Sequence, residues 1–353
     1  MTSIRLIAGE EAYRQISEQG LCSEMFSQIF AASGGPKWLG IAGLDKYLFG
    51  EFFKARQKPL HSLGTSSGAW RLACLAQQSP LLAYERLETL YINQRYDDKP
   101  TPQEISQRVK PLIRGILGAT GAKEIATNPI IRSHFIVCQG RHLNQLPQRW
   151  VQMAGLMLAA ATNVMSRRTL AWHFERKLFS TALLSAASPF EDLTDLPTQS
   201  VALNPTNMDQ VLLATGTIPL ILEPVLEIKG LGKGAFYDGG ITDYHFDFPL
   251  SQPKGLTIYP HFYPDITPGW FDKSLSWRRG KLNHSRTLIL APSNDFIAQL
   301  PYGKIPDRAD FSKMDSDQRI TYWNKAVALS ARLAEDFDQI LNSSQLAHKI
   351  EKL

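Results

Sequence analysis

The chain has 353 residues, of which 44% are hydrophobic and 20% are charged. This composition excludes a wholly disordered or fibrous chain and supplies enough apolar side chains for one large core. The formal net charge of +5 favours anionic partners only weakly and does not bear on the fold.

The first residues lack a long apolar segment with a small-residue cleavage site, so the sequence predicts no secretory signal. The most apolar run, residues 154–161, is far shorter than the roughly 20 residues that a spanning helix needs. The three cysteines lie far apart and predict neither a disulfide framework nor a zinc site. We therefore expect a cytoplasmic protein, with peripheral contact to a membrane as the alternative considered below.

In chain order, the first elements alternate between strands and helices. An apolar strand is predicted at residues 25–32 and a shorter one at 59–63, each followed by a glycine-rich turn and a helical pattern. Two such units in succession predict a parallel sheet covered by helices. Residues 81–123 read as amphipathic helices interrupted by prolines, and we expect them to form a helical cap over the sheet.

Further strands and helices are predicted in the remainder of the chain. Predicted strands lie at residues 133–138, 200–203, 256–259 and 287–291, with a hairpin over 223–238. Predicted helices lie at residues 150–179, 208–215 and 317–341. We expect a single domain over residues 1–353, with a motif-bearing core at 22–300 and a C-terminal helical extension at 301–353.

The sequence Gly64-Thr65-Ser66-Ser67-Gly68 fits the pattern G-x-S-x-G with Ser66 at its centre. In this pattern a sharp turn between a strand and a helix presents a serine hydroxyl, and the glycines remove side chains that would block it. Taken alone, the five residues are more typical of a glycine-bounded turn. The predicted strand before them and helix after them favour a nucleophile.

Gly34 and Gly35 follow the first predicted strand, where bare backbone amides are able to approach a reacting oxygen. An acyl-transfer reaction needs such amides for the oxyanion of its tetrahedral intermediate. The same residues also read as the start of a helix, with Ser33 as N-cap and Pro36 in the first turn. The two interpretations are compatible, because a helix N-terminus itself attracts anions.

Asp238 comes at the end of the predicted hairpin and is followed by Gly239 and Gly240. A carboxylate approached closely by Ser66 is able to accept its proton, provided that burial raises the pKa of the carboxyl above about 3.9. An isolated Asp-Gly-Gly is otherwise typical of a surface turn.

The order of these three motifs resembles that of the patatin-like phospholipase family, and residues 214–225 resemble the family's segment before its catalytic aspartate. The resemblance implies a three-layer α/β/α fold with a mainly parallel central sheet and helical cap insertions. It implies a dyad of Ser66 as nucleophile and Asp238 as general base, with Gly34 and Gly35 as the oxyanion hole. The implied reaction is the hydrolysis of lipid acyl esters, of the phospholipase A or lysophospholipase type, without a metal ion or other cofactor.

The glycine-rich loop departs from the family pattern at two positions. Pro36, which has no N–H group, stands where the family has a third glycine. Lys37 takes the place of the family's basic residue with an offset of one position, so we expect it to contact an anion or a lipid headgroup.

Three alternatives remain open at this point. A Ser-Asp-His triad would use His245, His261 or His284, which all follow Asp238 in the chain. An acyltransferase or thioesterase would use the same dyad with another acyl acceptor or substrate. A lipid-binding protein that has lost catalysis is the third alternative, and Pro36 is the residue that favours it.

Two stretches combine tryptophan with lysine and arginine, at residues 167–177 and 270–281. Such stretches suit the surface of an anionic membrane, where aromatic rings lie at headgroup depth and cations meet phosphate. The competing interpretation is a solvated helix face with its aromatic side chains in the core. We recognise no nucleic-acid-binding module, and the sequence does not determine the oligomeric state.

Overall fold

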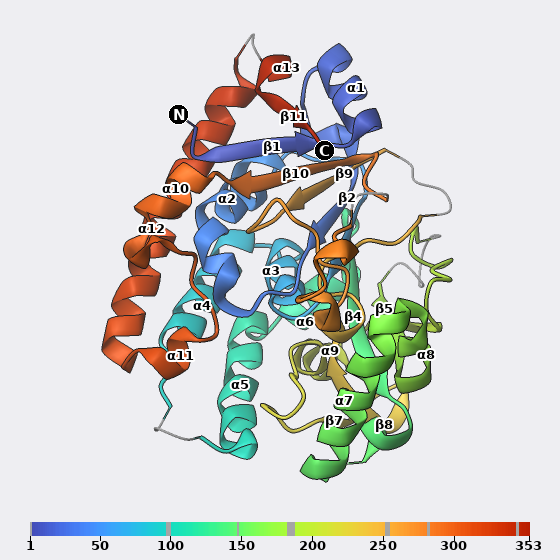
Figure 1. Cartoon of the computed structure of the whole chain (residues 1–353). Coiled ribbons are helices and arrows are strands. Elements are labelled where there is room, and N and C mark those ends of the chain that lie inside the picture. The colour runs from blue at the N-terminus through green and yellow to red at the C-terminus, as the bar shows by residue number, and fades with distance from the viewer. Residues whose placement is uncertain are drawn as a thin grey trace.

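The computed structural model describes residues 2–96, 100–146, 148–181, 188–250, 255–280, 283–343 and 346–353. Within these ranges, eleven strands form one mixed sheet that is flanked by helices (Figure 1). The strands are β1 (Ile4–Ala8), β2 (Phe26–Ala31), β3 (Leu60–Gly64), β4 (Ile131–Gly140), β5 (Phe174–Ser180), β6 (Thr198–Ala202), β7 (Val225–Ile228), β8 (Gly232–Asp238), β9 (Leu256–Pro260), β10 (Thr287–Pro292) and β11 (Ile350–Lys352). The α-helices are α1 (Glu10–Gln19), α2 (Ala42–Tyr47), α3 (Ser67–Leu75), α4 (Pro80–Ile92), α5 (Pro102–Leu117), α6 (Gly121–Thr127), α7 (Arg149–Met165), α8 (Leu170–His173), α9 (Met208–Thr215), α10 (Asn294–Gln299), α11 (Asp310–Lys313), α12 (Ser316–Leu341) and α13 (Leu346–Lys349).

The sheet has the order β11-β1-β10-β9-β2-β3-β4-β5-β6, and the hairpin of β7 and β8 joins it through β4. The central strands β10, β9, β2, β3 and β4 run parallel to one another. Antiparallel pairing occurs where β1 meets β10 and where β4 meets β5 and β8. The chain is therefore a mixed α/β protein with a mostly parallel sheet between helices, which is consistent with the expected three-layer arrangement.

The strands β2 and β3 position the candidate site. Most of their residues are buried, as expected for parallel strands covered on both faces. Ala31 pairs with Gly64 at their carboxyl ends. The loop after β2 and the turn after β3 therefore leave the sheet side by side, and these segments carry Gly34 and Ser66.

Helix α3 follows the turn at Ser66 and is fixed by polar contacts in the core. Arg71 donates two hydrogen bonds to Asp45 of α2, at 2.6 and 2.7 Å, and both side chains are fully buried. The hydroxyl of Tyr84, in α4, donates to the same carboxylate at 2.6 Å. The indole N–H of Trp70 donates to the carbonyl of Leu212 in α9 at 2.7 Å. These contacts fix α3 relative to three neighbouring helices.

The segment predicted as a cap, residues 81–123, folds into α4, α5 and the start of α6. Helix α5 begins with a capping box, in which Thr101 and Glu104 each satisfy the other's backbone N–H group. Helices α4 and α5 pack against each other and against α3.

One predicted helix is wrong at its C-terminal end. The predicted helix at 150–179 ends in short helical turns before Phe174, where β5 begins and pairs with β4 and β6. Of the β5 residues only Glu175 is not buried, so the segment shows no alternation that would reveal a strand. Strands β1 and β11 and helix α1 were not expected, and they extend the sheet beyond the predicted core at 22–300.

Candidate active site

Ser66 occupies the sharp turn between β3 and α3. Its backbone has φ of 53° and ψ of −132°, a conformation that side-chain-bearing residues rarely adopt and that marks strained functional turns. The backbone N–H of Ser66 donates to the hydroxyl of Thr215 at 3.0 Å. A Cβ atom on Gly68 would lie 2.0 Å from the carbonyl oxygen of Ala31, so only glycine permits α3 to pack this closely on β2.

Asp238 ends β8 and faces Ser66. The Ser66 hydroxyl donates to Asp238 Oδ2 at 2.7 Å, and the Gly240 amide donates to Asp238 Oδ1 at 2.7 Å. Both Ser66 and Asp238 are buried. Burial raises the pKa of Asp238, which the two hydrogen bonds and the nearby cations Arg308 and Lys273 partly oppose. Ser66 and Asp238 are far apart in the sequence, and the fold brings their side chains into contact.

The loop after β2 carries Gly34 and Gly35 beside the dyad. Gly35 has a φ of 59°, in the left-handed region that favours glycine. Within the described chain, neither the Gly34 nor the Gly35 amide has a hydrogen-bond acceptor. Two free amides therefore lie in the segment where the sequence predicted an oxyanion hole. The expectation of Ser33 as N-cap was wrong, because the 3₁₀ helix Gly35–Ile41 begins after Gly34 and no side chain caps it.

Three cationic side chains surround the entrance to the dyad. Lys37 follows the glycine pair, contacts the Tyr244 hydroxyl at 3.4 Å and lies over the rings of Tyr244 and Tyr263. Burial, followed by repulsion from Arg308, lowers the pKa of Lys37. Lys273 lies 4.1 Å from the centre of the Tyr244 ring. The pKa of Lys273 is also lowered, by desolvation and by the neighbouring cations, although solvent screens this effect because its side chain is partly exposed.

Arg308 is the third cation of this group, and its side chain is exposed. No carboxylate among the described residues lies within ion-pair distance of it, because the adjacent Asp307 pairs with Lys304 instead. Arg308, Lys273 and Asp238 line the same small cavity. Together, Lys273 and Arg308 give the cavity a positive potential that attracts anionic groups.

The cavity at the dyad has a volume of about 20 Å³. This volume accommodates roughly one water molecule. The cavity is also lined by Ser33, Ile218, Gly240, Tyr244 and Trp270. A cavity of this volume does not accommodate an acyl chain.

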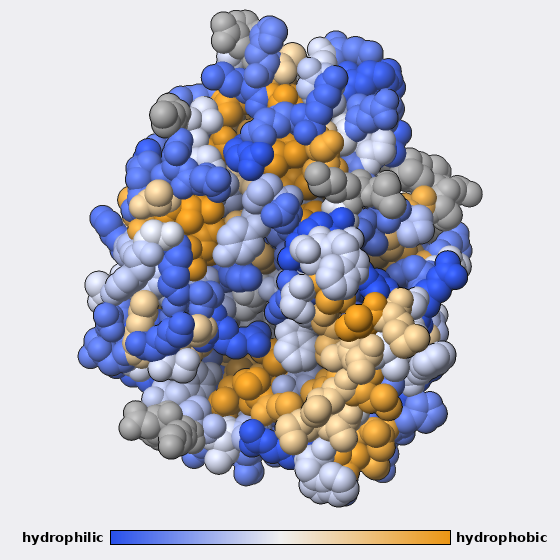
Figure 2. Space-filling model, in the orientation of Figure 1, coloured by the Kyte–Doolittle hydropathy of each residue, from blue (hydrophilic) through white to orange (hydrophobic). Residues whose placement is uncertain are grey.

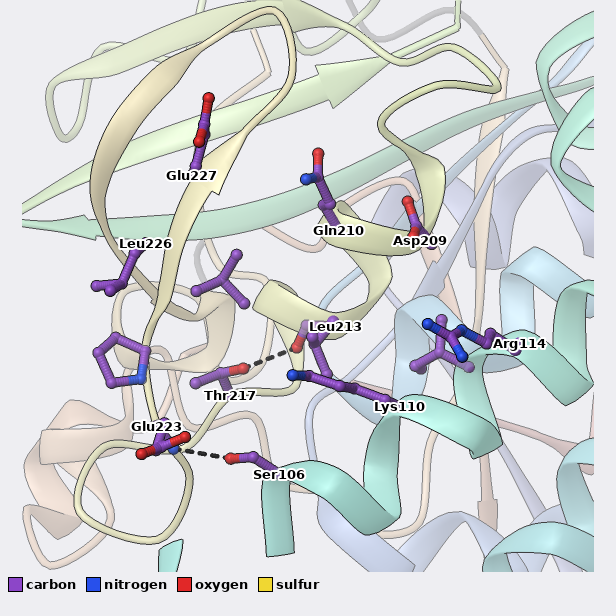
Figure 3. A pocket seen from close by; sticks show the side chains of 13 residues that line it. Ser106, Lys110, Arg114, Asp209, Gln210, Leu213, Thr217, Glu223, Leu226 and Glu227 are labelled. Atoms are coloured by element: carbon purple, nitrogen blue, oxygen red, sulfur yellow. Dashed lines mark hydrogen bonds between the residues drawn. The ribbon is translucent and has the colours of Figure 1, made fainter. Parts of the chain in front are cut away.

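A larger pocket of about 340 Å³ lies between α5, α9 and the start of β7 (Figure 3). Lys110 of α5 points across it toward Thr217, and the Glu223 amide donates to the Ser106 hydroxyl at 2.9 Å. Ser66 and Asp238 do not line this pocket. Residues 217–224 separate it from the dyad cavity, because Thr217 lines the large pocket and Ile218 lines the small one.

The three histidines considered for a triad lie in a buried aromatic cluster or near it. His245 stacks on Tyr244, and its ring Nδ1 accepts a hydrogen bond from the backbone N–H of Thr267 at 2.9 Å. Burial lowers the pKa of His261 to about 3. Within the described residues, none of His245, His261 and His284 is hydrogen-bonded to Ser66 or Asp238.

Sequence reasoning missed several contributors to the site, namely Thr215, Tyr244, Trp270, Lys273 and Arg308. Thr215 lies in the segment that carries the family resemblance, and its hydroxyl also donates to the Ile136 carbonyl at 2.6 Å. Tyr244 and Arg308 lie in no motif, and Trp270 and Lys273 belong to the stretch 270–281, which the sequence did not connect with the dyad. Their contribution becomes visible only once the fold brings these segments together.

Among the described residues, no helix is long and apolar enough to cross a membrane.

Comparison with models of known families gives no match, and comparison with curated proteins gives none either. Among solved structures, VipD from Legionella pneumophila is similar over 73% of this chain, with 12% sequence identity and a TM-score of 0.29. The match covers 53% of VipD, so this chain spans about half of that protein. A similarity this low does not establish a common fold, and the candidate site therefore rests on its own geometry.

Proposed function

We propose that the chain is a serine hydrolase of lipid acyl esters, of the patatin-like phospholipase kind, with Ser66 and Asp238 as its catalytic dyad. The observation that carries the proposal is the 2.7 Å hydrogen bond from the Ser66 hydroxyl to Asp238, made at a strained turn between a strand and a helix. Activation of a serine by a base within hydrogen-bond reach is the shared feature of such nucleophiles.

In the proposed reaction, Ser66 Oγ attacks the carbonyl carbon of the ester while its proton passes to Asp238 Oδ2. The carbonyl π electrons move to oxygen, and the amides of Gly34 and Gly35 stabilise the resulting oxyanion. As the intermediate collapses, the bond to the leaving alcohol breaks and Asp238 returns the proton to that oxygen. Water then attacks the acyl carbon while Asp238 accepts a proton from it. The bond between the acyl carbon and Ser66 Oγ breaks, Asp238 returns the proton to Ser66 Oγ, and the carboxylic acid is released.

The cations at the cavity support a phospholipid as the substrate class. Lys273 and Arg308 line the cavity with Asp238, and Lys37 contacts Tyr244 in the cavity wall. A phosphate diester near the scissile acyl bond would pair with these positive charges. The intact hydrogen bond between Ser66 and Asp238 supports an active enzyme over a lipid-binding protein that has lost catalysis.

Replacement of Ser66 by alanine tests the proposal. We expect Ser66→Ala to lose labelling by a fluorophosphonate probe and to lower kcat for a short-chain ester by roughly 10³-fold or more. Ser67→Ala is the matched control, because the Ser67 hydroxyl is buried next to Ser66 and has no hydrogen-bond partner among the residues that the structure describes. Labelling that persists in Ser66→Ala, or that disappears only in Ser67→Ala, would exclude Ser66 as the nucleophile.

A further inference from the structure

Helix α7 presents an apolar face to solvent. Trp150, Met157 and Met165 are exposed over 72%, 67% and 85% of their surfaces, and Met153, Leu158 and Val164 over half or slightly more. Figure 2 shows pale and deep orange surface gathered over α7, at the lower right of the view. Contiguous apolar surface of this kind on a folded protein marks an interaction site.

Two polar residues of α7, Gln152 and Asn163, face into the protein, whereas Arg149 at its start is exposed. Gln152 is buried and donates to the Tyr237 hydroxyl at 2.7 Å. Asn163 is fully buried and donates to Asp272 at 2.7 Å. A surface helix ordinarily turns its apolar side to the core and its polar side to water. Helix α7 departs from this pattern, because it buries apolar side chains such as Val151 and Leu156 against the protein and exposes other apolar side chains to solvent. Its outer face therefore fits an apolar environment outside the protein.

The apolar face continues onto two neighbouring segments that also carry tryptophan. Trp172 of α8 is exposed over 62% of its surface and Trp277 over 69%. Arg278, next to Trp277, donates to the carbonyl of Asn163 at 2.7 Å and so holds that segment against α7. The expectation that the aromatic residues of both basic stretches lie in the core was therefore wrong for these two tryptophans.

The charges around this face are almost all positive. Residues 141–177 contain six lysine or arginine residues and a single acid, Glu175. Glu175 is neutralised by Arg141 and Lys177, at 2.8 and 2.7 Å. Arg149 and Arg168 are exposed, and α7 itself has no acidic residue.

We propose that α7, together with Trp172 and Trp277, forms a docking surface for an anionic phospholipid bilayer. The surface has the composition of an interfacial helix, with methionine and leucine that enter the acyl region, tryptophan at headgroup depth and arginine that meets phosphate. A second copy of this chain suits it less well, since a symmetric contact would place the same positive charges opposite one another.

The docking surface is connected to the wall of the dyad cavity. Asp272, which accepts the hydrogen bond from Asn163, lies between the cavity-lining residues Trp270 and Lys273. Arg167, just after α7, pairs with the same Asp272 at 3.4 Å. Docking of α7 therefore holds the cavity next to the lipid from which a substrate would come.

Vesicle co-sedimentation tests the surface, and all variants are made in the Ser66→Ala protein so that hydrolysis does not alter the vesicles. We expect binding to an equal mixture of phosphatidylcholine and phosphatidylserine, weaker binding to phosphatidylcholine alone, and release by high salt. Trp150→Ser and Met157→Ser should each weaken binding roughly tenfold. Arg149→Gln and Arg168→Gln should each weaken it roughly fivefold on the anionic vesicles only.

Leu82→Ser is the control, because Leu82 is exposed over 57% of its surface on α4, far from α7 (Figure 1). It should bind vesicles as the parent protein does, and circular dichroism should show all variants folded. Absence of vesicle binding by the folded parent, or unchanged binding in Trp150→Ser and Met157→Ser, would overturn the proposal. So would a dimer in gel filtration that Met157→Ser converts to a monomer without vesicle binding. None of these outcomes depends on whether Ser66 is the nucleophile.

Discussion

The environment of Asp238 combines two opposing effects on its acidity. Burial raises the pKa of this carboxyl, which strengthens it as a base toward Ser66. The hydrogen bonds from Ser66 and Gly240 and the charges of Arg308 and Lys273 lower the pKa, which keeps the carboxylate ionised. A base must be ionised to accept a proton, so activity should rise as pH increases through the pKa of Asp238.

Removal of the charge on Arg308 should shift this pH dependence. Arg308 lowers the pKa of Asp238, so Arg308→Gln should raise that pKa. The acidic limb of kcat/KM should then move to higher pH, by up to about one unit, when a neutral short-chain ester is the substrate. Arg308→Lys retains the charge and should keep the limb close to its original position. An unchanged limb in Arg308→Gln would show that Arg308 does not act on Asp238.

At the scale of single residues, the sequence identified some parts of the candidate site and not others. Ser66 and Asp238 stand in short motifs whose glycines leave a trace in the sequence, and the fold brings the two side chains into contact. Lys273 and Arg308 leave no such trace, because their proximity depends on how loops from different parts of the sheet converge. The sequence also did not predict the volume of the cavity, because side chains that are distant in sequence determine it.

Among the secondary-structure elements, α3 determines where Ser66 points. The buried pair of Arg71 and Asp45 joins α3 to α2, and Tyr84 adds a contact from α4. Removal of one partner of a buried ion pair leaves the other charge without compensation. The position of the nucleophile therefore depends on an interaction that does not itself touch the dyad.

Arg71→Met should destabilise the protein by about 3–5 kcal/mol, because Asp45 would remain buried with only the Tyr84 hydroxyl as a partner. Urea unfolding measures this change. The double variant Arg71→Met with Asp45→Leu should recover part of the loss, since both charges are then absent. Lys54→Met, which removes an exposed pair with Glu51, should change stability by less than about 1 kcal/mol. Equal effects of Arg71→Met and Lys54→Met would contradict this role of the buried pair.

The local sequence pattern determines which secondary-structure elements are predicted well. Strands β2 and β3 and helix α9 have apolar runs bounded by turn residues, and their positions were predicted within a few residues. Strand β5 was taken for helix because Arg176, a charged residue inside it, is buried against Asp243 and Asp195. An ion pair between residues so far apart in sequence cannot be read from the local pattern.

At the scale of the whole molecule, the two ends of the chain lie at one edge of the sheet (Figure 1). Strand β11 pairs in parallel with β1, with Leu6 opposite Ile350 and Ala8 opposite Lys352. The amide of Leu353 donates to the carbonyl of Ala8 at 2.9 Å. Because β10 and β9 separate β1 from β2, this edge lies remote from the dyad.

Deletion of residues 346–353 should therefore affect stability more than catalysis. The deletion removes the buried side chain of Ile350 and the backbone hydrogen bonds of β11, which together should cost about 2–4 kcal/mol in urea unfolding. The kcat of the remaining folded protein should stay close to that of the full chain. Glu351→Gln, which keeps the strand and removes only its exposed pair with Arg5, should alter stability by less than about 1 kcal/mol. The deletion also leaves β1 as an unpaired edge, so self-association at high concentration should increase. An unchanged urea midpoint after the deletion would show that β11 does not stabilise the sheet.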